Sequence, residues 1–347
     1  MDRQENNFDF LRIFAAGLVL FSHQFALLGK TEPTFLSRIS FGSLGVCIFF
    51  SISGYLVCQS WMRDPHAVRF VARRVLRIWP ALFVVTALCV LVLGPLVSSL
   101  SLKAYFGSAE TWNFFKALLL LIKYKLPGVF ESNPFPDAIN GSLWTIPIEV
   151  KWYVLMLVAG VLKLLRFRYL ISILLIGLLV YYFGIDQAKI NPKENYFLQY
   201  GLFFMSGVWL SLFEDVWRKP LIRPVLYIAV AAIAAYAFVH PLLGLWIFVP
   251  YAAIRFGLAA TPVIRQFGRF GDFSYGLYIY AFPVQQLVVW WTNASLNIPL
   301  SLALSTAGTA ILAFLSWHLV EKPALQFRPK QRARSESELE RLLAPNL

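Results

Sequence analysis

Residues 10–28 read FLRIFAAGLVLFSHQFALL, an almost unbroken apolar run that holds one arginine and one histidine. About 20 predominantly apolar residues suffice for a helix to cross the hydrocarbon core of a bilayer, so this run predicts a membrane-spanning helix. Arg12 and His23 are 11 positions apart. Eleven steps of about 100° end roughly 20° past three full turns and about 16 Å along the axis. The two side chains therefore share one face of the predicted helix.

The composition of the whole chain also indicates a membrane protein. Of its 347 residues, 59% are hydrophobic and 14% are charged, whereas soluble domains average roughly 45–50% and about 25%. A soluble fold of this length would leave much apolar surface in water. The 31 Phe, 15 Tyr and 11 Trp residues also exclude a disordered chain. We expect lipid to surround most of the molecule.

The predicted fold class is all-α, a polytopic bundle of about ten transmembrane helices. Lys and Arg are concentrated in alternate connecting segments, and the positive-inside rule then puts both the N- and the C-terminus in the cytoplasm. We assign residues 1–325 to the membrane domain and residues 326–347, where charges alternate, to a cytoplasmic tail. The predicted spans are 10–28, 41–60, 78–97, 143–163, 169–184, 197–213, 224–240, 242–258, 273–291 and 299–319.

The net charge of +13 does not predict a nucleic-acid partner, because the basic residues lie between apolar segments and are not interleaved with aromatic residues. Cys47, Cys58 and Cys89 fall in apolar runs without paired spacing, so we predict neither a disulfide framework nor a metal site. Residues 98–142 are expected outside the membrane, as an interfacial or lid helix and a loop. The oligomeric state stays open.

Among the four histidines and eighteen acidic residues, only His23 and Glu149 lie well within predicted spans. Such residues are costly in lipid and are therefore candidates for function. His23 is about five residues from the outer end of its span and Glu149 about seven from the outer end of its own, so their depths should agree within roughly 3 Å. Lys151 is two positions from Glu149, on another helix face. We hypothesise a chemical role for both residues; the alternative is that they only support packing.

The segment from Arg69 to Pro80 reads RFVARRVLRIWP and is expected to form an inner loop. Arg73 and Arg77 are one helical turn apart, and guanidinium groups bind phosphate in a planar, bidentate way. The pair therefore predicts a phosphate-binding fork. Orientation of the chain by positive charge is a sufficient alternative explanation.

Motifs of other catalytic classes are missing from the sequence: G-x-S-x-G, a P-loop, H-E-x-x-H and G-x-G-x-x-G after a strand. Group transfer from a bound, activated donor, with His23 as the base, is the simplest chemistry. A proton-coupled glycan or glycolipid transporter or flippase, with His23 and Glu149 as a proton relay, is the main alternative. A membrane subunit that only supports partner proteins is a third.

Six motifs in order resemble the acyltransferase 3 family of integral-membrane acyltransferases, over nearly the whole chain. They are Arg12 and His23 with ten residues between them, GVCIFFSISGY at 45–55, RRVLRIWP at 73–80, Ser142-Leu143-Trp144 through Glu149 to Tyr153, SYGLY at 274–278, and EKP at 321–323.

This resemblance implies a multi-pass enzyme of the bacterial inner membrane. It would move an acyl group, usually acetyl, from cytoplasmic acyl-CoA to a sugar hydroxyl of a polysaccharide or lipid-linked oligosaccharide. The resemblance makes His23 catalytic, and it assigns the acetyl-CoA donor to a set of four arginines: Arg12, Arg73, Arg74 and Arg77.

Further site candidates accompany these roles. Glu149 is expected to orient the His23 ring, and Ser53, Trp144, Tyr275 and Tyr278 are candidates for substrate contact or oxyanion stabilisation. Many relatives carry His where this chain has Tyr280, so a role for that histidine does not carry over. We expect a stand-alone enzyme without the extra hydrolase-like domain of some relatives.

Overall fold

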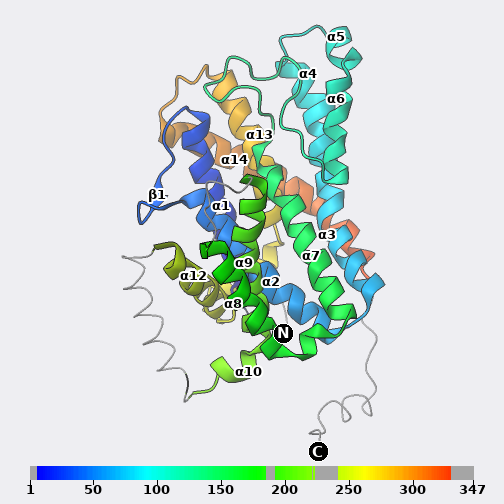
Figure 1. Cartoon of the computed structure of the whole chain (residues 1–347). Helices are drawn as coiled ribbons and strands as arrows, with labels where there is room; N and C mark the ends of the chain where they lie inside the picture. Colours follow the sequence, from blue (N-terminus) through cyan, green and yellow to red (C-terminus); the bar gives the residue numbers. More distant parts are fainter. Residues whose placement is uncertain (1–5, 185–191, 221, 223–240, 330–347) are drawn as a thin grey trace, which may run out of the picture.

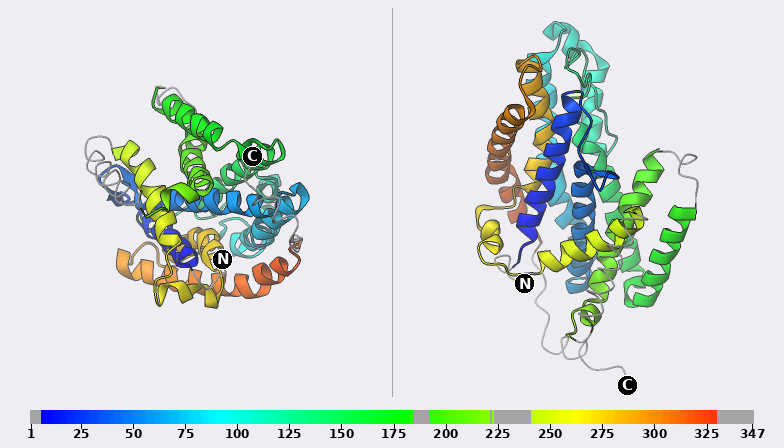
Figure 2. Two further views of the ribbon diagram at one scale, coloured as in Figure 1. Left: turned by 90° about the horizontal axis from the view of Figure 1, so that it is seen from below. Right: turned by 90° about the vertical axis from the view of Figure 1, so that its left-hand side faces the viewer.

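The computed structural model describes residues 6–184, 192–220, 222 and 241–329, which form a bundle of long helices (Figure 1). Its first two helices are α1 (Phe8–Leu27) and α2 (Phe41–Arg63), joined by a hairpin of β1 (Thr34–Phe35) and β2 (Ile39–Ser40). The Ser40 side chain accepts a hydrogen bond from Ser43 N and so caps α2. Figure 2 shows α1 and α2 side by side along the length of the molecule.

The third helix corrects the sequence prediction. α3 (Ala67–Leu88) continues through η2 (Cys89–Leu93) into α4 (Gly94–Val97), so the basic segment expected as a loop before residue 78 is helical. His66 caps this helix by accepting a hydrogen bond from Arg69 N. Asp64 lies just before the helix and forms ion pairs with Arg69 and Arg73. Because an acidic partner neutralises the basic first turns, the helix extends 11 residues beyond the apolar run.

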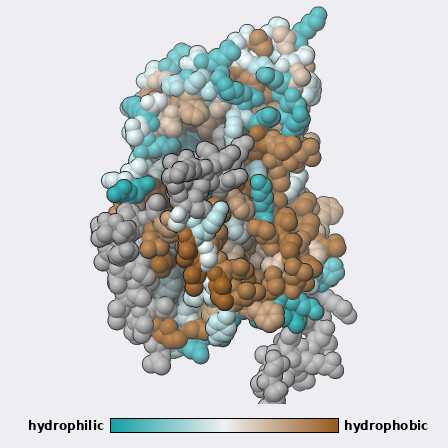
Figure 3. Space-filling model, viewed as in Figure 1, coloured by the Kyte–Doolittle hydropathy of each residue, from teal (hydrophilic) through white to brown (hydrophobic). Residues whose placement is uncertain are grey.

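The segment expected outside the membrane contains short helices and no span, as predicted. These are α5 (Leu102–Gly107), α6 (Ala109–Asn113) and η3 (Phe114–Leu119). They lie at the end of the molecule where hydrophilic side chains predominate, while brown, hydrophobic side chains cover the region below (Figure 3). The chain then returns through η4 (Gly141–Trp144) into α7 (Thr145–Val161).

The remaining described elements complete the bundle. α13 packs against both α1 and α14, and α9 packs along α2. In chain order these elements are η5 (Leu164–Arg166), α8 (Arg168–Gly184), α9 (Pro192–Leu212), α10 (Glu214–Trp217), α12 (Pro241–Gly257), η7 (Ile264–Phe270), α13 (Ser274–Trp291), α14 (Ile298–Ser316), η8 (Trp317–Glu321) and α15 (Lys322–Gln326).

Nine of the ten predicted spans coincide with helix, and the tenth, 224–240, lies outside the described residues. Within the described part of the chain, five helices are long and apolar enough to cross a membrane: Phe8–Leu27, Phe41–Arg63, Ala67–Val97, Gly141–Val161 and Ile298–Gln326. Arg168–Gly184 and Leu243–Gly257 are shorter apolar helices. The chain is a helical membrane protein; ten spans and cytoplasmic termini stay predictions.

Close packing of α2 on α9 depends on two glycines. A Cβ at Gly54 would lie 2.0 Å from the Phe204 carbonyl oxygen, and one at Gly207 would lie 2.2 Å from the Ser51 carbonyl oxygen. Each helix therefore approaches the other where its own side chain is missing, as small residues allow in membrane bundles.

The substitution Gly54→Ala should destabilise the protein by roughly 1–3 kcal/mol, because the added methyl group forces the two backbones apart. Gly17→Ala is the matched control, since a Cβ at Gly17 meets nothing within 4 Å. Thermal unfolding of the purified variants measures the difference. Equal midpoints for the two variants would contradict the close contact of α2 with α9.

Candidate functional site

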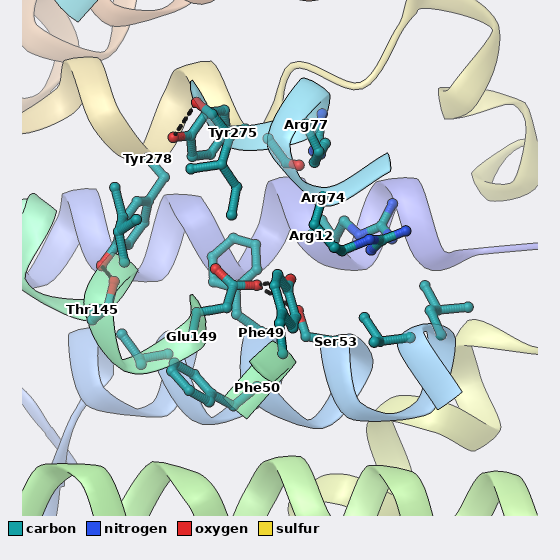
Figure 4. A pocket seen from close by; sticks show the side chains of 17 residues that line it. Arg12, Phe49, Phe50, Ser53, Arg74, Arg77, Thr145, Glu149, Tyr275 and Tyr278 are labelled. Atoms are coloured by element: carbon teal, nitrogen blue, oxygen red, sulfur yellow. Dashed lines mark hydrogen bonds between the residues drawn. The ribbon is translucent and has the colours of Figure 1, made fainter. Parts of the chain in front are cut away.

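A cavity of about 110 Å³ lies within the helix bundle, and Figure 4 shows its wall. Five helices contribute side chains: α1, α2, α3, α7 and α13. On α2 the lining extends from Val46 to Val57, a rise of about 16 Å. The lining residues are Arg12, Val46, Phe49, Phe50, Ser53, Leu56, Val57, Arg74, Arg77, Ile78, Thr145, Ile146, Glu149, Tyr153, Ser274, Tyr275 and Tyr278.

Two of the three arginines in this wall are neutralised by carboxylates. Arg12 forms ion pairs with Asp9 at 3.0 Å and Asp272 at 3.5 Å. Arg77 forms ion pairs with Asp272 at 2.9 Å and Glu321 at 3.4 Å. Asp272 and Glu321 are almost fully buried. The shared carboxylates hold α1, α3, the start of α13 and η8 together at one end of the cavity.

The third arginine, Arg74, has a different environment. Its guanidinium lies over the rings of Tyr153 at 5.7 Å and Phe70 at 6.0 Å. Its Nε atom is buried without a hydrogen-bond partner, and no ion pair to Arg74 occurs among the described residues. Figure 4 shows Arg74 beside Arg12 at the cavity. A buried cation without a carboxylate partner can hold an anionic ligand group.

Arg73 does not line the cavity. It is buried and forms an ion pair at 2.7 Å with Asp64, which also binds Arg69. The hydrogen bond from Arg69, together with Arg73, lowers the pKa of Asp64 to about 2. The predicted fork of Arg73 and Arg77 is thus divided, because each guanidinium meets a different carboxylate.

Glu149 lies in the middle of the cavity wall. It accepts hydrogen bonds from Ser53 Oγ at 2.9 Å and from the Tyr153 hydroxyl. Tyr275 donates its hydroxyl proton to the Ile78 carbonyl at 3.1 Å, and the Arg77 guanidinium lies 5.6 Å from its ring. The site candidates Ser53, Glu149 and Tyr275 therefore all lie in the wall of one cavity.

Opposite the arginines, the cavity is lined by Tyr278, whose hydroxyl lies 2.7 Å from Thr145 Oγ1. The Phe49 ring packs edge-on against Tyr278 at 5.7 Å. Trp144, another candidate, does not line the cavity; its ring packs on Tyr196 and Tyr200 at 4.9 and 5.6 Å. Tyr280 is buried and also lies outside the lining.

His23 lies about one helical turn beyond the Tyr278 end of the cavity. Its ring meets the Phe282 ring edge-on at 5.4 Å, and Phe282 follows Tyr278 by one turn of α13, a rise of about 6 Å. His23 Nδ1 is buried and has no hydrogen-bond partner. The face of α1 that carries Arg12 and His23 therefore extends from the arginines of the cavity to a point beyond Tyr278.

The predicted match in depth between His23 and Glu149 is wrong. Phe282, which contacts His23, also packs directly on Gly141, so η4, which leads into α7, begins near the level of His23. Glu149 is eight residues further along, about 12 Å deeper on the helical rise. Before α7 the chain packs into the bundle, where Asn133 donates hydrogen bonds to Gln286 and Asn140 to the Ile279 carbonyl. The lengths of the predicted spans do not indicate this.

Three carboxylates near the site were given no role by sequence reasoning: Asp9, Asp272 and Glu321. The EKP motif could have pointed to Glu321. Asp272 lies just before a predicted span, and no motif or spacing in the sequence marks it. Cys47, Cys58 and Cys89 are buried free thiols. Among the described residues, no group of three His, Cys, Asp or Glu side chains is placed to hold a metal ion.

Replacing Asp64 should destabilise the protein without changing the cavity. Asp64→Asn leaves Arg73 as a buried, unpaired cation, at a cost of roughly 3 kcal/mol at pH 7. Because the pKa of Asp64 is lowered from 3.8 to about 2, its contribution is present above about pH 4 and is lost as the pH falls through 2.

Asp215→Asn is the control, since Asp215 pairs with Arg168 in an exposed ion pair worth about 1 kcal/mol or less. Thermal unfolding midpoints at pH 7 compare the two variants. A loss for Asp64→Asn no larger than that of the control contradicts the assigned role of the buried pair.

Comparison with known proteins gives a consistent family assignment. A family model described as "Acyltransferase domain" matches residues 5–318. An O-acetyl transferase of Shigella phage Sf6 is 33% identical, over 92% of this chain and 96% of the relative. Nodulation protein 10 of Rhizobium leguminosarum bv. viciae is 29% identical, over 95% of each chain. No solved structure matches.

Proposed function

Because the chain belongs to this family and is an acyltransferase, we propose that it moves an acetyl or other short acyl group from cytoplasmic acyl-CoA to a sugar hydroxyl outside the cytoplasm. The acceptor would be a polysaccharide or a lipid-linked oligosaccharide, and the membrane the bacterial inner membrane. The observation that carries the proposal is the internal cavity, which extends from three arginines to Tyr278, one helical turn short of His23.

The donor fits the arginine end of this cavity. Acyl-CoA carries several phosphates at one end and a slim, flexible arm with the thioester at the other. Arg12, Arg74 and Arg77 would hold anionic groups, and Arg74 is best suited because no carboxylate competes for it among the described residues. The lining extends about 16 Å along α2, which suits an extended arm. Arg73 would act indirectly, by fixing the start of α3 through Asp64.

His23 would serve as the general base. It takes the proton of the acceptor hydroxyl as that oxygen attacks the thioester carbonyl carbon. The carbon–sulfur bond then breaks, and the imidazolium returns the proton to the leaving thiolate. The products are the acyl ester of the acceptor and free CoA, so no further reactant is needed.

Hydrogen bonding favours Tyr278 as the donor to the oxyanion. A hydroxyl has one proton to donate, and those of Ser53 and Tyr275 are already given to Glu149 and to the Ile78 carbonyl. In the pair of Thr145 and Tyr278 either hydroxyl can be the donor. When Thr145 donates, the Tyr278 proton is free to stabilise the oxyanion next to His23. Glu149 would fix Ser53 and Tyr153 in the wall.

Replacing His23 by Ala should lower acylation at least about 100-fold, because the general base is lost. Cells that express each variant are compared by mass analysis of surface and secreted glycans for the acetyl increment. His318→Ala is the control; His318 bonds the Phe314 carbonyl and does not line the cavity. Full acetylation by a correctly inserted His23→Ala protein removes the central assignment.

Arg74→Gln should weaken saturable binding of radiolabelled acetyl-CoA to the purified protein by about tenfold or more, since a buried charge–phosphate contact is lost. The neighbouring Arg73→Gln serves as the comparison, and it should weaken binding less because Arg73 faces Asp64. An equal loss in both variants would refute the assignment of Arg74. Failure of the wild-type protein to bind acetyl-CoA would favour a transporter instead.

A further inference from the structure

The connection after α1 brings Glu32 back to Ser22, the residue before His23. Gly29 adopts a positive φ of 68°, and Lys30 N donates a hydrogen bond to the Phe25 carbonyl, which ends the helix in a reversing turn. The chain therefore runs back along the last turn of α1. Glu32 follows this turn, and its carboxylate accepts a hydrogen bond from Ser22 Oγ, directly beside His23 in the sequence.

The surroundings hold Glu32 in this position. Phe41 N donates a hydrogen bond to the carbonyl of Pro33, which closes the hairpin immediately after Glu32. A Cβ at Gly42 would lie 3.1 Å from Ser22 Oγ and 3.8 Å from Glu32 Oε2. The start of α2 thus packs on the pair of Ser22 and Glu32, and Ser22 is fully buried. A conformation fixed by a turn, a hairpin and helix packing is suited to positioning.

His23 lacks the partner that such a carboxylate can supply. A histidine that acts as a base through one ring nitrogen is usually held in the right tautomer by an acceptor at the other. His23 Nδ1 is buried and unpaired, and the Glu32 carboxylate is hydrogen-bonded to Ser22, the residue that precedes His23. Glu149 is about 12 Å deeper on the helical rise and is occupied by Ser53 and Tyr153. Glu32 forms no ion pair among the described residues.

We propose that Glu32 is the positioning residue of His23, a role that rests on the proposed acyl transfer. In the reactive state its carboxylate accepts the Nδ1–H hydrogen bond, which leaves Nε2 as the base for the acceptor hydroxyl. When Nε2 takes that proton, Glu32 stabilises the imidazolium until the proton passes to the thiolate. No proton moves to Glu32, and Ser22 keeps the carboxylate in place between turnovers.

The test measures the reactivity of His23 itself and needs neither donor nor acceptor. The full-length protein in lipid nanodiscs is treated with diethyl pyrocarbonate at pH 7, and carbethoxylation is followed for each histidine by mass spectrometry. The variants are Glu32→Gln and Glu32→Asp. The matched control is Glu131→Gln, because Glu131 also accepts a hydrogen bond from a serine, Ser99 at 2.8 Å. Exposed His66 is the internal reference.

Glu32→Gln should slow modification of His23 several-fold relative to His66, and Glu32→Asp should recover part of the rate. Glu131→Gln should leave it unchanged. An unchanged rate in Glu32→Gln, or the same loss in Glu131→Gln, overturns the proposal. If Glu32→Gln does not fold, Ser22→Ala replaces it: a slower His23 rate supports the proposal and an unchanged rate overturns it.

Glycan acetylation in cells separates this inference from the proposed function. Loss of acetylation in Glu32→Gln, with partial recovery in Glu32→Asp, supports positioning for acyl transfer. Slower carbethoxylation in Glu32→Gln, combined with no acetylation by the wild-type protein, would sustain the pairing of Glu32 with His23 and refute the acyl transfer. Loss of acetylation with an unchanged His23 rate would place the role of Glu32 elsewhere and overturn the proposal.

Discussion

A charge buried among apolar helices is costly unless it is paired, and this cost organises the site. Arg12 and Arg77 share Asp272, and Glu321 adds a second carboxylate to Arg77. The desolvation cost of each guanidinium is offset only while these partners stay in place. These ion pairs therefore join α1, α3, the start of α13 and η8 at one end of the cavity. Arg12 and Arg77 of this cluster also line the cavity.

The same constraint distinguishes neighbouring residues with identical chemistry. Arg73 and Arg74 differ by one position and hence by about 100° around α3. Arg73 forms an ion pair with Asp64 and does not line the cavity, whereas Arg74 has no carboxylate partner among the described residues and lies at the cavity beside aromatic rings. A structural ion pair thus occurs beside the cation that we propose binds the ligand. The proposed division of labour between them follows from which carboxylates each one meets.

The sequence predicted the helical membrane fold and the helix shared by Arg12 and His23, and several of its polar candidates, such as Ser53 and Glu149, line the cavity, whereas Trp144 does not. It could not choose between Arg73 and Arg74, because motif and charge are the same for both. The start of α3 was missed because apolar length marks only part of a helix whose basic turns are neutralised by Asp64. Glu149 was placed too near His23, since the descent of the chain before Gly141 leaves no hydropathy signal.

The central claim is that an acyl group held by the arginine end of the cavity reaches His23 beyond Tyr278. A cryo-electron microscopy structure of the protein in nanodiscs with a non-hydrolysable thioether analogue of acetyl-CoA tests it most directly. The account predicts phosphate density at Arg74 and the acyl carbon next to His23, at a reacting distance of about 3–3.5 Å from an acceptor oxygen. An acyl end that stops below Tyr278, with the Phe282 ring unmoved between it and His23, would contradict the account.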